Sequence, residues 1–216
     1  MGCGKSSVGR KLSELLCCSF MDLDDVIIEN AGKSIPEIFA TDGETAFRKM
    51  ERDMLGDIIT TAGRHSAPLA PSHLSMGPSP YPGVGKCQFR TYASQPLENT
   101  TIILALGGGA VMQEECDKMV HDCTICIYLK ASVDTLLDHL EGQAAGRPLL
   151  NTASVMSSEV ETSTKRAALK ERILDLMAKR ASTYERTAHH IIDTDNKSIE
   201  DIAAEICHLL NCQSAQ

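Results

Sequence analysis

A glycine-rich run followed at once by a helical pattern constrains the fold more than any other feature of this chain. The run is Gly2-Cys3-Gly4-Lys5-Ser6-Ser7, and the residues at 8–16 have helical spacing. Glycines let successive backbone N–H groups approach phosphate oxygens, and a helix N-terminus attracts the same anions. The pattern therefore predicts a phosphate-binding loop, in which Lys5 contacts the β- and γ-phosphates and the Ser6 hydroxyl binds Mg²⁺.

The complete form of this motif starts with a further glycine and follows a β-strand. Because the sequence opens at Met1, we expect the first strand of the fold to be absent and its neighbouring strands to lack a partner. The opening also fits M-G-x-x-x-[ST], a myristoylation pattern, with Cys3 available for palmitoylation. A flexible polar stretch usually follows such an anchor, whereas here a helix follows directly, which favours the phosphate loop.

Composition narrows the class of protein. The 216 residues carry a net charge of −8 without a basic patch, so no nucleic-acid partner is expected. No apolar run approaches the roughly 18–20 residues of a membrane span, and no membrane association is expected. A secretion signal is not visible, and the nine cysteines then suggest a reducing compartment and a cytoplasmic protein.

Apolar strands alternate with helical patterns along the chain. This order predicts an α/β fold with three layers, in which helices cover both faces of a central parallel sheet, and a single domain over residues 1–216. The expected strands are 19–24, 102–106, 124–129 and 190–194, and the expected helices are 6–17, 25–31, 34–40, 44–62, 110–121, 132–141, 169–188 and 198–211.

Two segments interrupt this rhythm. Residues 64–99 contain six of the eight prolines together with many serines and glycines, so they are predicted to form a flexible surface insertion. Residues 142–165 are predicted to be mobile and to include a lid.

Two carboxylates follow the first expected strand. Asp22 and Asp24 lie two residues apart, so on a strand end both would point to the same side, at the edge where such sheets bind ligands. One could hold the water of a Mg²⁺ ion, and the other could accept a proton from an attacking hydroxyl.

The order of these and later motifs resembles that of the shikimate kinases over most of the chain outside residues 64–99 and the stretch after Leu150. The motifs are the phosphate loop, Met21-Asp22-Leu23-Asp24, Ile38-Phe39-Ala40-Thr41-Asp42-Gly43-Glu44, Phe47-Arg48, Leu106-Gly107-Gly108-Gly109-Ala110, Gly146-Arg147-Pro148-Leu149-Leu150, and Lys179-Arg180-Ala181 with Tyr184. The resemblance implies a phosphate-loop kinase that transfers the γ-phosphoryl group of ATP to the 3-hydroxyl of shikimate, with Mg²⁺, in aromatic amino acid biosynthesis. The products would be shikimate 3-phosphate and ADP.

The resemblance also implies a role for each site residue. Asp24 would bind the substrate hydroxyls and act as the base, and Lys5 and Arg147 would assist catalysis. The implied substrate-binding residues are Asp24, Arg48, Gly108, Gly109 and Arg180; the ATP-binding residues are Gly2, Cys3, Gly4, Lys5, Ser6, Ser7 and Arg147; the metal-binding residues are Ser6 and Asp22. Glu51, one turn after Arg48, could orient that arginine through an ion pair, or could be a solvated surface residue.

Two other functions remain open from the sequence. One is a kinase for another small polyol acid, such as gluconate, although the pair Arg48 and Arg180 together with the triple glycine argues against this function. The other is a non-catalytic or truncated kinase-like protein, which the absent strand would favour. The resemblance also implies a monomer whose only binding partners are its small-molecule substrates.

Overall fold

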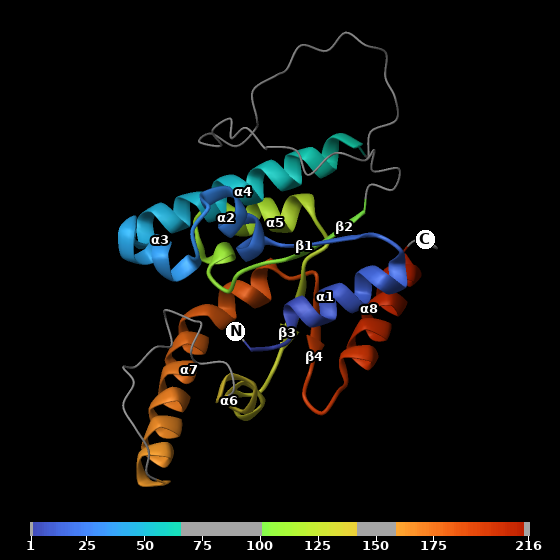
Figure 1. The fold of residues 1–216 in the computed structure, drawn as a ribbon. Coiled ribbons are helices and arrows are strands. Elements are labelled where there is room, and N and C mark those ends of the chain that lie inside the picture. The colour runs from blue at the N-terminus through green and yellow to red at the C-terminus, as the bar shows by residue number, and fades with distance from the viewer. Residues whose placement is uncertain (1, 66–100, 142–158, 214–216) are drawn as a thin grey trace, which may run out of the picture.

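The computed structural model describes residues 2–65, 101–141 and 159–213 and shows helices alternating with short strands (Figure 1). The expected insertion falls almost entirely on residues outside this description, as do residues 142–158 of the expected lid. The helices are α1 Lys5–Leu16, α2 Leu23–Ala31, α3 Ile35–Thr41, α4 Gly43–His65, α5 Cys116–Cys123, α6 Val133–Glu141, α7 Glu159–Thr187 and α8 Ile199–Gln213, with a 3₁₀ turn at Ala110–Met112; the strands are β1 Ser19–Asp22, β2 Ile102–Ala105, β3 Ile127–Lys130 and β4 His190–Asp193.

The strands form two parallel pairs. β1 pairs with β2, with Phe20 opposite Ile103, and β3 pairs with β4, with Tyr128 opposite Ile191. Among the described residues no strand joins the two pairs, so each is a two-stranded sheet. The α/β class and the parallel direction agree with the sequence, but the described strands form two separate pairs and not the single central sheet that was expected.

Helices cover both faces of the β1–β2 pair (Figure 1). On one side α2 and α4 pack with α3 and α5 into the largest core cluster, whose most buried members are Leu23, Ile27, Ile38 and Leu55. On the other side α1 lies against α8, and a second cluster joins these helices to β3 and β4. A third cluster joins α6 to α7 around Leu137, so three apolar clusters hold the described elements together.

Local sequence signals explain several helix ends. α2 ends at Gly32, whose φ of +63° lies in the left-handed region that glycine adopts at low cost. α3 begins after Ser34, and the Glu37 carboxylate accepts hydrogen bonds from the Ser34 N–H at 2.7 Å and from its hydroxyl at 2.6 Å. Pro36 lies in the first turn of α3, where its missing N–H has no helical partner to lose.

Three expected elements differ from the structure. The helix expected over 110–121 is broken into the 3₁₀ turn and α5, because Gln113 is extended and Glu115 has a φ of +77°. The strand expected at 124–129 begins only at Ile127. α7 begins at Glu159, ten residues before the expected start at 169, so the end of the segment expected to be mobile is helical.

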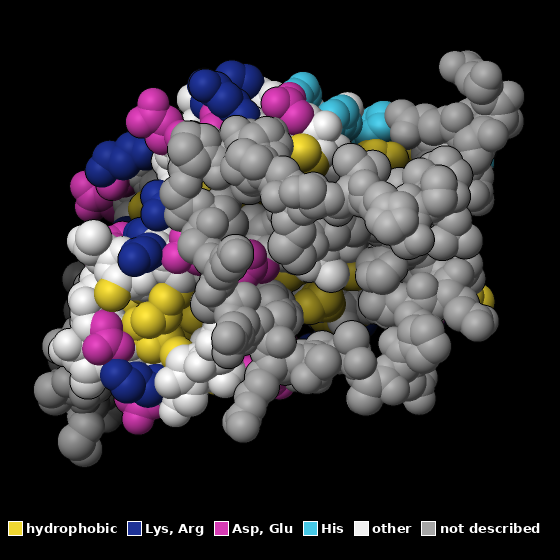
Figure 2. Space-filling model, turned by 90° about the horizontal axis from the view of Figure 1, so that it is seen from above, with side chains coloured by type: hydrophobic (Ala, Val, Ile, Leu, Met, Phe, Trp, Pro, Cys, Tyr) yellow, Lys and Arg dark blue, Asp and Glu magenta, His cyan; other side chains and the backbone are white. Residues whose placement is uncertain are grey.

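The described surface has no broad area of one charge in the view of Figure 2, where Lys and Arg side chains lie among Asp and Glu side chains. Histidines gather along one border of the same face (Figure 2). Within the described ranges, no helix combines the length and the apolar character that crossing a membrane requires.

Replacement of a core leucine tests this packing. Leu55 is 1% exposed in the middle of α4, so Leu55→Ala is expected to lower the free energy of unfolding by about 2–5 kcal/mol. Leu174→Ala is the matched control, because Leu174 is also helical but 49% exposed, and a change below about 0.5 kcal/mol is expected. Urea denaturation measures both values, and equal losses would contradict the described core.

Candidate active site

The phosphate loop lies directly before α1. Gly2 and Gly4 have φ values of +70° and +74°, which only glycine adopts at little cost, and the helix begins at Lys5 without an intervening segment. The Val8 N–H donates to the Gly4 carbonyl at 2.9 Å and so closes the first helical turn. His139 of α6 holds the other end of the loop, since its Nδ1 lies 2.7 Å from the Gly2 carbonyl oxygen.

The two residues predicted to bind the metal lie together. Asp22 ends β1, and the Ser6 hydroxyl on the first turn of α1 donates to Asp22 Oδ2 at 2.5 Å. A hydroxyl and a carboxylate are the hard oxygen ligands that Mg²⁺ prefers. No group of three or more His, Cys, Asp or Glu in the described ranges could hold a metal ion alone. The pair therefore fits Mg²⁺ that takes most of its ligands from phosphate and water.

Asp24 lies on a helix and not on the strand end where the sequence placed it. β1 ends at Asp22, whose side chain caps α2 by accepting the Asp24 N–H at 3.1 Å. The expectation that both carboxylates project together from one strand was therefore wrong. Asp24 instead faces the loop after β2, because a Cβ added at Gly107 would lie 3.0 Å from Asp24 Oδ1.

Arg48 is held by two carboxylates of its own helix. Its Nη1 donates to Glu51 Oε2 at 2.7 Å, and its Nη2 donates to Glu44 at 3.2 Å. Glu51 is only 1% exposed and also accepts a bond from Gln113 Nε2 at 3.1 Å. The ion pair by which Glu51 was expected to orient Arg48 is confirmed. The contact of Gln113 with Glu51 was not predicted, because the two residues are 62 positions apart and no motif in the sequence links them.

Burial governs the charge of Glu51. Removal from water raises its pKa above the ordinary value, and the nearby Asp24 carboxylate acts in the same direction. The ion pair with Arg48 and the bond from Gln113 oppose this rise because they favour the charged form. Arg48 is thus the main group that favours the ionised form of this buried carboxylate beside the site.

The triple glycine after β2 is tightly enclosed. A Cβ at Gly107 would lie 2.9 Å from Glu51 Oε1, and one at Gly109 would overlap the guanidinium of Arg48. Only glycine lets the loop approach these charged groups so closely.

Helix α7 reaches the same loop from the opposite side. The Gly108 carbonyl accepts hydrogen bonds from Arg180 Nη1 at 3.2 Å and from the Tyr184 hydroxyl at 2.5 Å. Asp24 of α2, Arg48 of α4 and Arg180 of α7 therefore meet around one three-residue segment. Tyr184 belongs to the same motif as Arg180, but the sequence assigned it no role.

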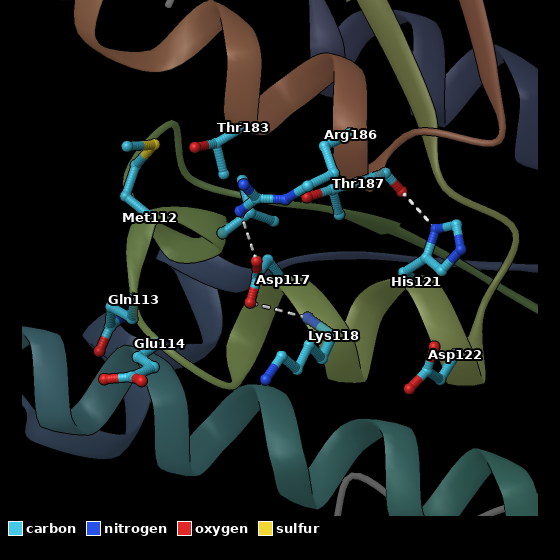
Figure 3. A pocket seen from close by; sticks show the side chains of 11 residues that line it. Met112, Gln113, Glu114, Asp117, Lys118, His121, Asp122, Thr183, Arg186 and Thr187 are labelled. Atoms are coloured by element: carbon cyan, nitrogen blue, oxygen red, sulfur yellow. Dashed lines mark hydrogen bonds and ion pairs between the residues drawn. The ribbon is translucent and has the colours of Figure 1, made fainter.

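Two cavities border this region, and they differ in size and in the residues that line them. The smaller, of about 100 Å³, runs from the phosphate loop to the triple glycine, and Lys5, Gly107 and Gly108 line it. The larger, of about 590 Å³, lies between α5 and α7 (Figure 3), where Arg186 pairs with Asp117 at 2.7 Å. None of the predicted site residues lines the larger cavity, so we place the candidate active site at the smaller one.

One predicted residue is missing from this description. Arg147 and the segment around it, which was predicted to form the lid, lie outside the described residues.

Comparison with known proteins identifies the family of the chain. The family model for shikimate kinase matches residues 1–65 and 84–211 and omits only an internal part of the expected insertion and the last residues. The chain belongs to the shikimate kinase family. The shikimate kinase of Salinibacter ruber is 29% identical over 214 residues, which cover 99% of this chain and 82% of that protein. That of Thioalkalivibrio sulfidiphilus is 32% identical over 206 residues, covering 95% and 80%.

Solved shikimate kinases share the fold. The enzyme from Acinetobacter baumannii, solved in complex with shikimate, superimposes with a TM-score of 0.71 at 25% identity and covers 100% of this chain and 91% of that one. The enzyme from Bacteroides thetaiotaomicron gives a TM-score of 0.68 at 22% identity, with 98% and 94% covered. The shikimate kinase family thus accounts for nearly the whole chain.

Removal of Arg48 is expected to leave Glu51 as an uncompensated buried charge. Arg48→Ala should lower the free energy of unfolding at pH 7 by about 3 kcal/mol, and the double variant Arg48→Ala/Glu51→Gln should recover part of that loss. Without Arg48 the pKa of Glu51 rises further, so the folded state binds a proton more readily than the unfolded state, and stability should increase as the pH falls through that pKa.

Denaturant titrations from pH 4 to pH 8 test this expectation. Lys179→Ala is the control, because it breaks an exposed pair with Asp175 and should cost less than about 1 kcal/mol. A loss in Arg48→Ala that is no larger than in the control would show that the buried pair does not hold the site.

Proposed function

We propose that this chain transfers the γ-phosphoryl group of ATP to the 3-hydroxyl of shikimate, the reaction of its family. The observation that carries the proposal is the convergence of Asp24, Arg48 and Arg180, from three helices, on the triple glycine beside a phosphate loop. One acidic and two basic groups around a narrow backbone segment suit a substrate with hydroxyls on one side and a carboxylate on the other.

The two arginines form the carboxylate clamp in this proposal. A guanidinium group presents parallel N–H donors that match the two oxygens of a carboxylate. Arg48 and Arg180 approach the triple glycine from different helices, so one substrate carboxylate between them would be fixed in position and orientation. The backbone of Gly108 lines the smaller cavity on this side and has no side chain to block the substrate, and the Gly109 backbone lies next to it.

Asp24 is the proposed general base. It lies at the Gly107 side of the same segment, two residues after Asp22, which accepts a hydrogen bond from the Ser6 hydroxyl. It would bind the substrate hydroxyls, accept the proton of the attacking one and align its oxygen with the γ-phosphorus. Positioning of this kind supplies most of the rate gain in phosphoryl transfer.

The phosphate loop binds ATP in this proposal. Backbone N–H groups of Gly2, Cys3 and Gly4 would hold the phosphates, with Lys5 on the transferred group and Ser7 assisting. Ser6, with Asp22 behind it, would hold Mg²⁺, which neutralises phosphate charge when bound. Arg147 would close over the phosphates with the lid and balance the charge that develops during transfer.

The remaining features follow the family. We propose one domain over residues 1–216, carrying an insertion at about 64–99 and a lid at about 142–165. The protein would be a cytoplasmic monomer whose partners are its small-molecule substrates.

Substrate-dependent release of ADP tests the proposed reaction. With MgATP, the chain is expected to release ADP when shikimate is present and to release little without it. Gluconate in place of shikimate is the control, because it offers hydroxyls and a carboxylate on a flexible open chain. Release with gluconate alone would assign the chain to another polyol acid, and release with neither would support a non-catalytic protein.

Asp24→Asn tests the base. Loss of the proton acceptor is expected to lower kcat by about 10²- to 10⁴-fold while the melting temperature changes little. Asp25→Asn is the matched control, because Asp25 lies next in α2 but is exposed and pairs with Arg10 at 3.8 Å. Similar kcat values for the two variants would remove Asp24 from the chemistry.

A further inference from the structure

Tyr184 contacts the active-site loop although neither the sequence nor the family comparison assigns it a role. It lies on α7 one turn after Arg180, and its hydroxyl donates to the Gly108 carbonyl oxygen at 2.5 Å. The Arg180 guanidinium donates to the same oxygen at 3.2 Å. Tyrosine and arginine thus share one carbonyl acceptor.

The surroundings of Tyr184 hold its hydroxyl as a donor. Its ring packs on Tyr128 of β3, with ring centres 5.3 Å apart and planes tilted by 48°. Burial raises the pKa of Tyr184 above that of an ordinary phenol, so the group stays protonated at neutral pH. A fixed ring with a protonated hydroxyl gives the Gly108 carbonyl a rigid partner.

This contact sets the direction of the next amide group. None of the described peptide bonds is cis, and in a trans peptide the carbonyl and the following N–H point in opposite directions. Because Tyr184 holds the Gly108 carbonyl towards α7, the Gly109 N–H points away from α7. No hydrogen bond from that N–H to another described residue is seen, although the neighbouring Ala110 N–H donates to Gly107.

We propose that Tyr184 is a positioning residue for the substrate: its hydroxyl turns the Gly108–Gly109 peptide so that the Gly109 N–H can donate to bound shikimate, and it orients Arg180 for the carboxylate. The inference rests on the proposed function for the identity of the substrate. Tyr184 acts through the loop and the arginine and does not itself touch the reacting atoms.

The hydroxyl of Tyr184 can be removed without disturbing the packing of its ring. In Tyr184→Phe the ring can still pack on Tyr128, and the Gly108 carbonyl keeps Arg180 as a donor, so no buried acceptor is left unpaired. The loop and Arg180 would lose a shared anchor instead. Binding of shikimate should therefore weaken while the rest of the enzyme stays intact.

Steady-state kinetics of Tyr184→Phe test the inference. The KM for shikimate is expected to rise about five- to tenfold, as expected for one or two weakened hydrogen bonds, with little change in the KM for ATP or in the melting temperature. Thr183→Val is the matched control, because it removes a hydroxyl from the residue before Tyr184 that lines the larger cavity, and it should leave all three values near wild type. An unchanged KM for shikimate, or equal rises for both substrates, would overturn the positioning role.

A second measurement separates this inference from the proposed function. In ¹⁵N-labelled protein without substrate, the Gly109 amide signal is expected to shift in Tyr184→Phe, because the preceding carbonyl has lost a hydrogen bond. It is expected to stay in place in Thr183→Val. An unmoved Gly109 signal overturns the inference whatever the substrate is. A shifted signal in a chain that releases no ADP with shikimate supports the contact and contradicts the proposed function alone.

Discussion

The buried ion pair between Arg48 and Glu51 is the interaction on which the rest of the site depends. Glu51 is almost fully enclosed, and an ionised carboxylate in such a place is costly unless it is paired and hydrogen-bonded. Arg48 supplies the charge, and Gln113 supplies a second donor from the segment after the triple glycine. The pair therefore does two things at once: it anchors that segment to α4, and it fixes a guanidinium group beside Gly109.

The site is assembled from both sides of one glycine segment. Charged groups of α2 and α4 enclose Gly107 and Gly109, while α7 holds the Gly108 carbonyl through Arg180 and Tyr184. A segment without side chains can be enclosed so closely and still leave its backbone open to a ligand. The larger cavity between α5 and α7 contains none of these groups, so its size does not make it the reactive site.

Short patterns in the sequence predicted much of this arrangement. The helix after the glycine-rich run follows from a local motif, and the resemblance to shikimate kinases implied that Ser6 and Asp22 lie together, as the structure shows. Prediction was less successful where local preference competes with a longer contact. Asp24 was expected on a strand but lies on α2, because the Asp22 side chain caps that helix. The single helix expected over 110–121 is broken at Gln113, whose side chain instead reaches Glu51.

The sequence by itself determined the class of fold and, to within one residue, the helix starts at Lys5 and Ile35, because glycine conformation, capping and apolar spacing act over a few neighbouring residues. Only the tertiary structure decided which distant groups meet. Gln113 and Glu51 are 62 residues apart, and Tyr184 and Gly108 are 76 apart. No local pattern encodes such pairs, because their contact arises only when the packing of α4 and α7 around the loop brings them together.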